Sequence, residues 1–444
     1  MHLVNLTTAR LKRIATLTFT IFIYSISHAQ ENSPYSRYGM GDLVPNRNIV
    51  SRGMGGIVAG YSDFQSINLS NPAALGSATT TIFDLAGEIS RRTLKSNISP
   101  IKFTATNTFI SYLQVGFPIA TKKMQQKGNY WGVSFGLRPI SQINYRIQKD
   151  ERLSGIDSLR TTYEGTGGLN QANISTGIKI KNLSLGVSGG YSFGNKDYST
   201  TLSFINDSVA YYKSNSAAQT RISGFFITLG AQYDIKMKNG LLRLGAYANL
   251  QQNLRAKRDN INQTINFDGN GGTIAIDTVD FKTAVKGTIK IPATYSAGFT
   301  YVGKHWLFGA DVDVTNWGTY SYFGVKDAVQ NTWVVRVGTQ YYPAKDNTSA
   351  NKYWNFVKYR AGIYYGPDYI KLNKSRPDYG VTFGAAFPLT SFQRLRFGEF
   401  VTLNTGVEIG ARGDKNSQSI RENIARFSFG ISMNARWFQK QKYD

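Results

Sequence analysis

Two carboxylates one residue apart form the clearest pattern in this chain for acid–base chemistry. Asp311 and Asp313 alternate with apolar residues, so in an extended strand both point to one face. Paired carboxylates can share proton transfer in a hydrolase. However, the chain has no cysteine, and His305 is its only histidine after residue 28. It also lacks a nucleophile elbow and a phosphate-binding loop. We therefore expect a protein that is not an enzyme and uses no cofactor or metal.

Basic residues give a second candidate site, because a guanidinium group binds a carboxylate through two parallel hydrogen bonds. By alternation, several basic residues share the face of the acidic residues Asp311, Asp313 and Glu408; they are Arg138, Lys179, Arg243, Arg336, Arg360 and Arg436. Most of these charges should pair with one another, since an unpaired buried charge is costly. The alternative is that one or two of them hold a ligand carboxylate. Arg336 and Arg360 are the best candidates because they fall on neighbouring strands, and Arg138 is a third.

The elements that would position these side chains are β-strands. Residues 427–437 alternate between an apolar face, with Phe427 and Trp437, and a polar face, with Asn434 and Arg436. The same alternation recurs at 131–137, 172–187, 225–233, 242–250, 293–301, 306–314, 333–341 and 401–409. One apolar and one hydrated face are typical of a transmembrane barrel. After residue 29, no 18 consecutive apolar residues could form a spanning helix.

Loop lengths decide the number of strands. Counting each alternating segment separately gives fifteen, which conflicts with the even number of a single-chain bacterial barrel. Merging 183–204 into one strand and 209–234 into the next removes the conflict and keeps the turns at one end short. The external loops are then 91–102, 148–157, 253–282, 317–329, 368–377 and 413–424. We predict an all-β transmembrane antiparallel barrel of about 14 strands, with twelve and sixteen as alternatives.

The first 29 residues predict export. A basic start at 10–13 precedes a mostly apolar stretch, and small residues at 27 and 29 suit a signal peptidase. An uncleaved anchor is the alternative, but the stretch is short for a span. We divide the chain into a signal peptide (1–29), an N-terminal plug (30–78), a transmembrane barrel (79–438) and a C-terminal periplasmic tail (439–444). We expect it in the outer membrane of a Gram-negative bacterium.

The charge of the chain favours lipid over nucleic acid as its surroundings. The formal net charge of +24 falls to about +21 when the three cations of the signal are subtracted. The remaining charges are spread along the chain and form no basic helix or compact patch. We expect outer-membrane lipid and lipopolysaccharide as neighbours and no nucleic acid.

Glycine and proline residues mark possible moving parts. Gly53, Gly55 and Gly56 allow close backbone approaches that side chains forbid. The Asn71-Pro72-Ala73 motif is either a bend leading into the first strand or a hinge that lets the plug shift.

Pro139 interrupts an otherwise regular alternation from 131 to 147, where it cannot donate to a ladder. It is either a turn that splits two strands or a kink that opens the barrel wall.

Motifs at both ends of the mature chain carry a family resemblance. Near the start are Arg52-Gly-Met-Gly-Gly56 and Ile67-Asn-Leu-Ser-Asn-Pro-Ala73. Late in the chain are Ile291-Pro-Ala-Thr-Tyr295, Thr315-Asn-Trp317 and Tyr359-Arg-Ala-Gly362. In this order they resemble the FadL family of outer-membrane transporters for long-chain fatty acids and hydrophobic compounds. The resemblance leaves the middle of the chain unmatched. It implies a fourteen-stranded barrel, an internal plug and a kinked third strand that opens sideways.

Two functions follow from this resemblance. The first is passive transport of hydrophobic or amphipathic, fatty-acid-like molecules, through a lumen pocket beside the plug and a lateral opening at Pro139. The alternative is a FadL-like accessory or scaffold subunit of an outer-membrane secretion or barrel-assembly complex. The aromatic segment 33–42, the long 253–282 segment and the basic tail 439–444 would suit contacts with other subunits. A hydrophobic small molecule is the expected partner in the first case and other complex subunits in the second.

Overall fold

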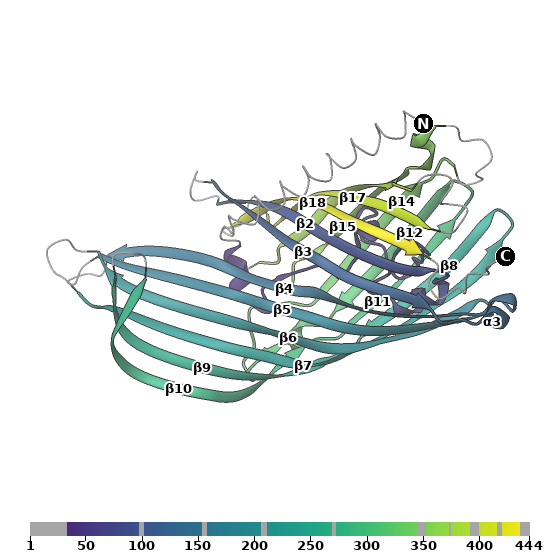
Figure 1. The fold of residues 1–444 in the computed structure, drawn as a ribbon. Helices are drawn as coiled ribbons and strands as arrows, with labels where there is room; N and C mark the ends of the chain where they lie inside the picture. The colour runs from purple at the N-terminus through teal and green to yellow at the C-terminus, as the bar shows by residue number, and fades with distance from the viewer. Residues whose placement is uncertain are drawn as a thin grey trace, which may run out of the picture.

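Fourteen strands of the computed structural model close into one antiparallel barrel (Figure 1). The structure describes residues 33–96, 102–152, 158–205, 211–268, 272–344, 352–372, 374–390, 399–414 and 420–435. The barrel strands are β2 (Thr81–Lys95), β3 (Lys102–Pro118), β4 (Tyr130–Arg152), β5 (Ser158–Ile180), β6 (Leu183–Phe204), β7 (Lys213–Met237), β8 (Gly240–Asn249), β11 (Thr294–Val302), β12 (Trp306–Thr315), β14 (Thr332–Tyr341), β15 (Lys358–Pro367), β16 (Pro377–Pro388), β17 (Phe400–Arg412) and β18 (Arg421–Ala435). Each pairs with the next, and β18 pairs with β2 to close the wall. The predicted fold class and strand number are confirmed.

Exposed side chains mark the band of the wall that faces lipid. On β18, Phe427, Ile431 and Met433 are exposed on the outer face, whereas Ser428 and Ser432 are buried on the inner face. We call the end at which β18 finishes the periplasmic end, and the opposite end the external end. Membrane barrels carry aromatic residues at both interfaces. The periplasmic aromatic row here contains Trp131, Tyr233, Trp306 and Tyr359. The external aromatic row contains Tyr191, Phe225, Tyr295, Trp333, Tyr365 and Tyr379.

One side of the barrel continues beyond the external aromatic row as a tall sheet (Figure 1). Its strands β4 to β7 are 22 to 25 residues long. A hairpin of β9 (Gln252–Phe267) and β10 (Thr273–Ile291) extends it, because β9 pairs with β7 from Ser223 to Lys213, beyond the end of β8. We call this projecting part of β4 to β7, with β9 and β10, the external wall.

The prediction of an external loop at 253–282 was wrong, because most of that segment is the β9–β10 hairpin. Leu254 and Ala256 are buried on one face of β9, while Arg255 and Lys257 are exposed on the other. This is strand alternation, but its outer face is charged and therefore lacks the apolar signature of a lipid-facing strand. Among the described residues, no helix is long and apolar enough to cross a bilayer.

Residues 33–78 run through the inside of the barrel, and we call them the plug. The plug contains η1 (Pro34–Arg37), β1 (Asp42–Leu43), α2 (Ile49–Arg52) and η2 (Pro72–Ser77). An asparagine side chain caps the first residues of both α2 and η2. The side chain of Asn48 accepts the N–H of Ser51 at the start of α2, and that of Asn71 accepts the N–H of Ala73 at the start of η2. The plug is thus a folded insert with little regular secondary structure.

Pro139 lies within the continuous strand β4, so the alternative of a turn that splits two strands there was wrong. The pairing of β4 with β5 shifts register between Pro139 and Ser141, as at a β-bulge. On its other side, β4 pairs with β3 only from Gly132 to Leu137. Beyond that level β3 continues along β2 to Lys102 without pairing to β4. Pro139 thus lies where the pairing with β3 has ended and the pairing with β5 is irregular, and proline is tolerated at strand edges and bulges.

Candidate functional site

The contact between the plug and the inside of the wall is the candidate functional site. Where the plug touches the wall, the wall residue is often glycine. We call these residues the glycine belt: Gly116, Gly132, Gly177, Gly186, Gly230, Gly245, Gly309, Gly338, Gly362, Gly384 and Gly430. Two show why no side chain fits. A Cβ at Gly245 would lie 1.9 Å from the carbonyl oxygen of Ala59, and one at Gly338 would lie 2.1 Å from that of Met54. At these positions the backbone of the plug therefore packs directly against the backbone of the wall.

Polar wall side chains bind the backbone of the plug. The carboxylate of Asp311 accepts the N–H groups of Val58 and Ala59, with donor–acceptor distances of 2.5 and 2.8 Å. The Nε2 of Gln232 donates to the carbonyl oxygen of Ala59 at 2.9 Å. The hydroxyl of Thr300 donates to the carbonyl oxygen of Gly60 at 2.7 Å. Irregular buried backbone needs such partners, and here the wall supplies them.

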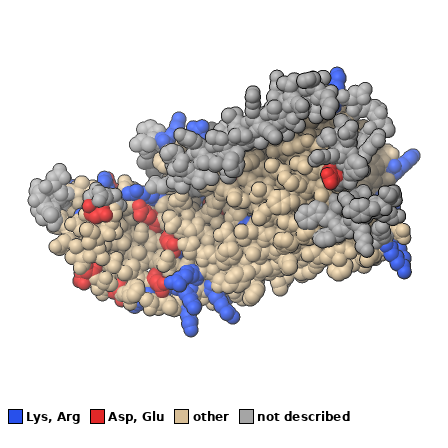
Figure 2. Space-filling model, viewed as in Figure 1, with Lys and Arg blue, Asp and Glu red and all other residues tan. Residues whose placement is uncertain are grey.

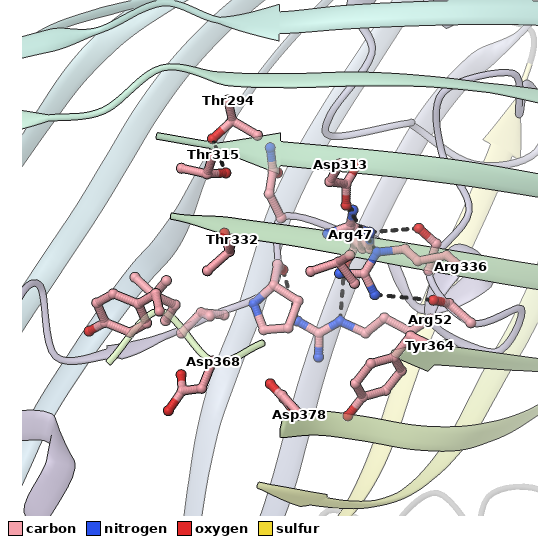
Figure 3. Close-up of a pocket in the computed structure, with 18 of the residues that line it drawn as sticks. Arg47, Arg52, Thr294, Asp313, Thr315, Thr332, Arg336, Tyr364, Asp368 and Asp378 are labelled. Atoms are coloured by element: carbon pink, nitrogen blue, oxygen red, sulfur yellow. Dashed lines mark hydrogen bonds and ion pairs between the residues drawn. The ribbon is translucent and has the colours of Figure 1, made fainter. Parts of the chain in front are cut away.

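A plug arginine and a wall arginine converge on Asp313. Figure 3 shows Arg47 and Arg336 pointing toward this carboxylate from two sides. Arg47 forms an ion pair with Asp313, and the Nε of Arg336 lies 3.0 Å from the same oxygen. The Nε of Arg47 also donates to the carbonyl oxygen of Gly56 at 2.6 Å. Asp313 is therefore shared between the plug and β14.

A second buried group links α2 to the closing strands. Arg52 forms an ion pair with Glu88 on β2. The Nε of Arg426 on β18 lies 3.4 Å from Glu88, and its Nη1 lies 2.8 Å from Glu408 on β17. The guanidinium of Arg52 thus reaches the pair of strands, β18 and β2, at which the barrel closes.

A third group joins β1 to the external end of the wall. Asp42 forms ion pairs with Arg92 and with Arg412, the latter at 3.1 Å. Burial by itself raises the pKa of the Asp42 carboxyl, but the guanidinium groups of Arg92 and Arg412 outweigh burial and hold that pKa well below its ordinary value. Asp42 therefore stays charged and attached to two wall strands, β2 and β17.

A cavity of about 290 Å³ lies beside the plug among these groups (Figure 3). Its lining contains five arginines and four carboxylates: Arg47, Arg52, Arg336, Arg412, Arg426, Asp313, Asp368, Asp378 and Glu408. Binding an apolar molecule there would remove water from charged groups without replacing their hydrogen bonds, which is unfavourable. The cavity is chemically suited to water and to the ion pairs that it contains.

Of the three arginines predicted to bind a ligand, Arg138 and Arg360 are buried and Arg336 is partly buried, and each bonds to a different protein partner. Arg336 lines the cavity and bonds to Asp313. Arg360 donates to Gln340 at 2.9 Å and to Asn404 at 3.2 Å. Arg138 donates to Gln171 at 2.7 Å, and the structure does not bring it together with the other two. Arg436 lies outside the described residues. Binding of a carboxylate ligand by any of them stays a prediction.

The predicted hinge residues all lie in the contact with the wall. Gly53, Gly55 and Gly56 are buried against β14 to β16, and the N–H of Gly55 donates to the hydroxyl of Thr382 at 2.8 Å. The side-chain amide of Asn71 donates to the carbonyl oxygen of Ala59 at 2.8 Å. Pro72 and Ala73 lie against wall glycines of β5 and β6. These contacts hold the motif to the wall, and movement about it stays a prediction.

At Pro139 the plug takes the place of the missing part of β3. In β1, Asp42 lies opposite Gln142 and Leu43 opposite Ser141 in an antiparallel ladder. The N–H of Val44 donates to the carbonyl oxygen of Ile140 at 3.0 Å. The unpaired edge of β4 is therefore covered here by a strand from inside the barrel.

Asp311 and Asp313, the pair with possible acid–base chemistry, are both committed to the plug. Asp311 accepts two backbone N–H groups, and Asp313, which lines the cavity, pairs with two arginines, so both carboxylates are engaged by protein groups. Within the described ranges, no three His, Asp or Glu side chains are grouped to hold a metal. His305 lies in a turn and its ring contacts the carbonyl oxygen of Tyr342 at 3.1 Å.

The plug itself provides charged partners for the wall that were not predicted from the sequence. Asp42, Arg47 and Arg52 follow one another at five-residue spacing in a segment with no other charged residue. Their charges are opposite to those of their wall partners Arg92, Asp313 and Glu88. This regular spacing was the available signal, since charged side chains in a segment destined for a lumen require partners there.

Comparison with known proteins agrees with this geometry. A family model described as BamG matches residues 11–444. The solved CymD monoaromatic hydrocarbon channel has a TM-score of 0.53 at 14% identity, over 90% of this chain and 100% of that one. The toluene transporter TodX of Pseudomonas putida gives 0.53 at 16% identity, with the same coverage. A FadL homologue of Pseudomonas aeruginosa gives 0.52 at 14% identity, over 89% and 100%. No curated protein matches the chain by sequence. At these identities the likeness establishes a FadL-type fold.

Proposed function

Because this chain belongs to the BamG family and folds as a FadL-type outer-membrane barrel, we propose that it is an accessory or scaffold subunit of an outer-membrane complex. In this function the barrel is a membrane-anchored body, and the external wall offers a surface to a partner protein. Secretion and barrel assembly are the processes in which we expect such a complex to work.

One observation carries this proposal: the external wall exposes large apolar side chains far from the lipid band. They are Ile274, Ile276, Val279 and Phe281 on β10, with exposed fractions of 53, 49, 72 and 59%, and we call them the edge patch. Phe281 lies opposite Ile261, which lies opposite Ala217 on β7. Ala217 is eight residues beyond Phe225 of the external aromatic row, or about 27 Å along the strand. Exposed apolar groups in water at that height favour a protein partner.

The backbone of β10 is also open to a partner. Among the described residues, β10 pairs with β9 on one side. On its other side, Ile289 and Lys290 pair with β13 (Ser321–Tyr322), and the carbonyl oxygen of Thr288 accepts the N–H of Phe323. Register shifts between Ala275 and Asp277 and between Thr278 and Asp280 interrupt the regular pleat. Such bulges oppose a continuous added strand and redirect side chains outward. Contact through the edge patch is therefore favoured over an added β-strand.

The interior of the barrel is consistent with a structural role. The glycine belt brings the plug against strands around the wall, and three buried ionic groups connect the two. The cavity beside the plug is lined by charges and suits an apolar ligand poorly. With its lumen filled in this way, the barrel offers the outside of its wall as the surface that a partner protein can contact.

The test is purification of the tagged full-length chain from its own membranes in mild detergent. We expect a protein partner in stoichiometric amount, and we expect Ile276→Ser/Val279→Ser/Phe281→Ser to release it. The matched control is Val325→Ser, which changes another exposed external residue, with an exposed fraction of 67%. Purification of the wild-type barrel without any stoichiometric partner would contradict the proposal.

Passive transport of hydrophobic or amphipathic molecules is the second candidate, and one observation favours it. The separation of β3 from β4 beyond Leu113 and Leu137 leaves a place in the wall that β1 of the plug covers. Displacement of β1 would open a lateral exit toward lipid, which suits a molecule that avoids water. Uptake of a fluorescent long-chain fatty acid into vesicles that contain the purified barrel tests this candidate. Uptake no faster than into protein-free vesicles would contradict it.

A further inference from the structure

We propose that the outer face of the external wall holds a binding site for phosphate groups of outer-leaflet lipid. The site consists of five basic residues on three adjacent strands, and we call it the basic ladder: Arg221 on β7, Arg255 and Lys257 on β9, and Lys286 and Lys290 on β10. All five are exposed. Their neighbours along the strands, Ile222, Leu254, Ala256 and Ile289, are buried on the inner face. The basic side chains therefore share the outer face.

The register of the strands places like charges directly against one another. Arg221 lies opposite Lys257, and Lys257 lies opposite Lys286. Like charges at directly opposed positions destabilise a sheet. Asp259 offsets part of this repulsion, because its carboxylate accepts from the Nη2 of Arg221 at 2.9 Å. Lys257 and Lys286 have no ion-pair partner among the described residues. These opposed like charges destabilise the sheet when no ligand is bound. An anion bound across them would offset that repulsion.

The height of the basic ladder identifies the kind of anion. Arg255 lies opposite Ser223, which is two residues beyond Phe225 of the external aromatic row. Arg221 is four residues beyond Phe225, or about 13 Å along the strand. These residues therefore stand immediately outside the lipid band, where headgroup phosphates lie. In Figure 2, Lys and Arg side chains gather at the lower edge of the molecule, between the mostly uncharged barrel surface and the part of the wall that shows Asp and Glu.

The geometry fits a headgroup with more than one phosphate. Three in-register strands present the basic ladder over a distance of two strand spacings, about 10 Å. A single free phosphate would contact one or two of these residues, whereas a headgroup carrying two phosphates on a sugar scaffold spans all three strands. Each basic residue close to lipid phosphate strengthens binding about fivefold, and this effect falls off within a Debye length. The contribution of each residue is therefore local and can be removed by a single substitution.

The experiment compares lipid binding by two matched variants of the full-length barrel. Purified, delipidated protein is titrated with bisphosphorylated lipid A in mixed micelles, and bound lipid is counted by native mass spectrometry. Lys257→Gln/Lys286→Gln removes two charges from the basic ladder, and Lys236→Gln/Lys238→Gln removes two exposed charges at the periplasmic end. We expect the first pair to weaken binding on the order of 30-fold and the second to leave it unchanged.

Three results would overturn the proposal. They are equal binding by the two variants, equal binding of a dephosphorylated lipid, and saturation of the site by inorganic phosphate alone. A second measurement guards against misfolding of the variant. Because the substitution removes like-charge repulsion, Lys257→Gln/Lys286→Gln should unfold at a higher temperature than the wild type in lipid-free, low-salt detergent. A lower unfolding temperature would contradict the repulsion on which the site is built.

Discussion

Leu43 of the plug lies opposite Ser141 of β4, in the ladder position that β3 occupies nearer the periplasmic end. A strand from inside the barrel therefore completes the hydrogen bonding of a strand in its wall. This relationship connects the two candidate functions, because transport requires β1 to leave and a scaffold role does not. The first prediction separates them.

Linking β3 to β4 should abolish transport and spare partner binding. The side-chain amide of Asn107 on β3 donates to that of Gln142 on β4 at 2.6 Å, and the chain has no cysteine of its own. Asn107→Cys/Gln142→Cys can therefore be joined by a thiol-specific cross-linker with a reducible spacer, which covers the reach of the two amide side chains. We expect the cross-linked variant to lose uptake of a fluorescent fatty acid and to regain it when the spacer is reduced. Each single-cysteine variant is the control, and undiminished uptake by the joined barrel would rule out exit between β3 and β4.

Adding one methyl group to the glycine belt should loosen the plug. At Gly245, the new Cβ would meet the backbone of Ala59, so plug or wall has to shift. Gly245→Ala should destabilise the protein by about 1–3 kcal/mol, measured by thermal unfolding, and expose the plug to protease. Gly189→Ala is the matched control, because its Cβ would meet only an atom 3.6 Å away. Equal protease resistance of the two variants would contradict close seating of the plug.

Removing Asp313 should cost more stability than removing Arg47. Asp313→Asn leaves two guanidinium groups, those of Arg47 and Arg336, without their shared carboxylate. A buried charge that loses its partner costs about 3–5 kcal/mol. Arg47→Met leaves Asp313 still paired with Arg336, so its cost should be smaller. Urea unfolding of both variants in detergent measures the difference, and the reverse order would show that Arg336 does not share the charge of Asp313.

Lowering the pH should leave the contact of Asp42 intact down to strongly acidic conditions. Its pKa is lowered below the ordinary value of 3.8, because the nearby guanidinium groups outweigh burial. The contribution of this carboxylate to stability is therefore fully present above pH 3.8 and is lost only as the pH falls through the lower, folded-state pKa. The difference in plug protease resistance between wild type and Asp42→Asn should stay constant from pH 7 to about pH 4. A difference that vanishes near pH 5 would contradict the pairing with Arg92 and Arg412.

If the plug turns about its Asn-Pro-Ala motif, Pro72→Ala should slow uptake without lowering the amount of folded barrel. Proline fixes its own φ and restricts the residue before it, so alanine would relax the bend at Asn71. Heat-modified mobility on gels reports the folded barrel, and vesicle uptake reports transport. Pro388→Ala, at the end of β16, is the control outside the plug. Unchanged uptake by Pro72→Ala would leave the motif as a fixed bend.

Alternation along the chain was sufficient to predict the barrel. Its period of two identified the lipid-facing residues of β18, and the short turns at one end led to the strand count. The polar face of β18 meets the plug, because the side-chain amide of Asn434 donates to the carbonyl oxygen of Phe64 at 3.0 Å. These features can be predicted from the sequence because successive residues of each strand face lipid and lumen in turn, so the strand's own residue types show both environments.

Contacts between distant segments were not readable in this way. The alternation of side chains predicted that Arg336 and Arg360 point inward. It could not predict that Arg336 would pair with Asp313 or that Arg360 would bond to Asn404. The external wall was missed for a different reason: β9 and β10 have water on the outer face, so their alternation lacks the apolar pattern used for counting. β9 pairs with β7 because β7 extends beyond the external end of β8, and alternation within a single strand does not reveal this difference in length.

The glycine belt and the buried ion pairs divide the recognition of the plug between them. A surface without side chains has little means of telling one position along the plug from the next, so on its own it would tolerate sliding. The charges of Asp42, Arg47 and Arg52 pair with opposite charges in the wall and fix the alignment at three separated points. At these three points, a substitution in the plug should therefore be accompanied by a compensating substitution in the wall. Each position of the glycine belt should instead remain glycine independently of the others.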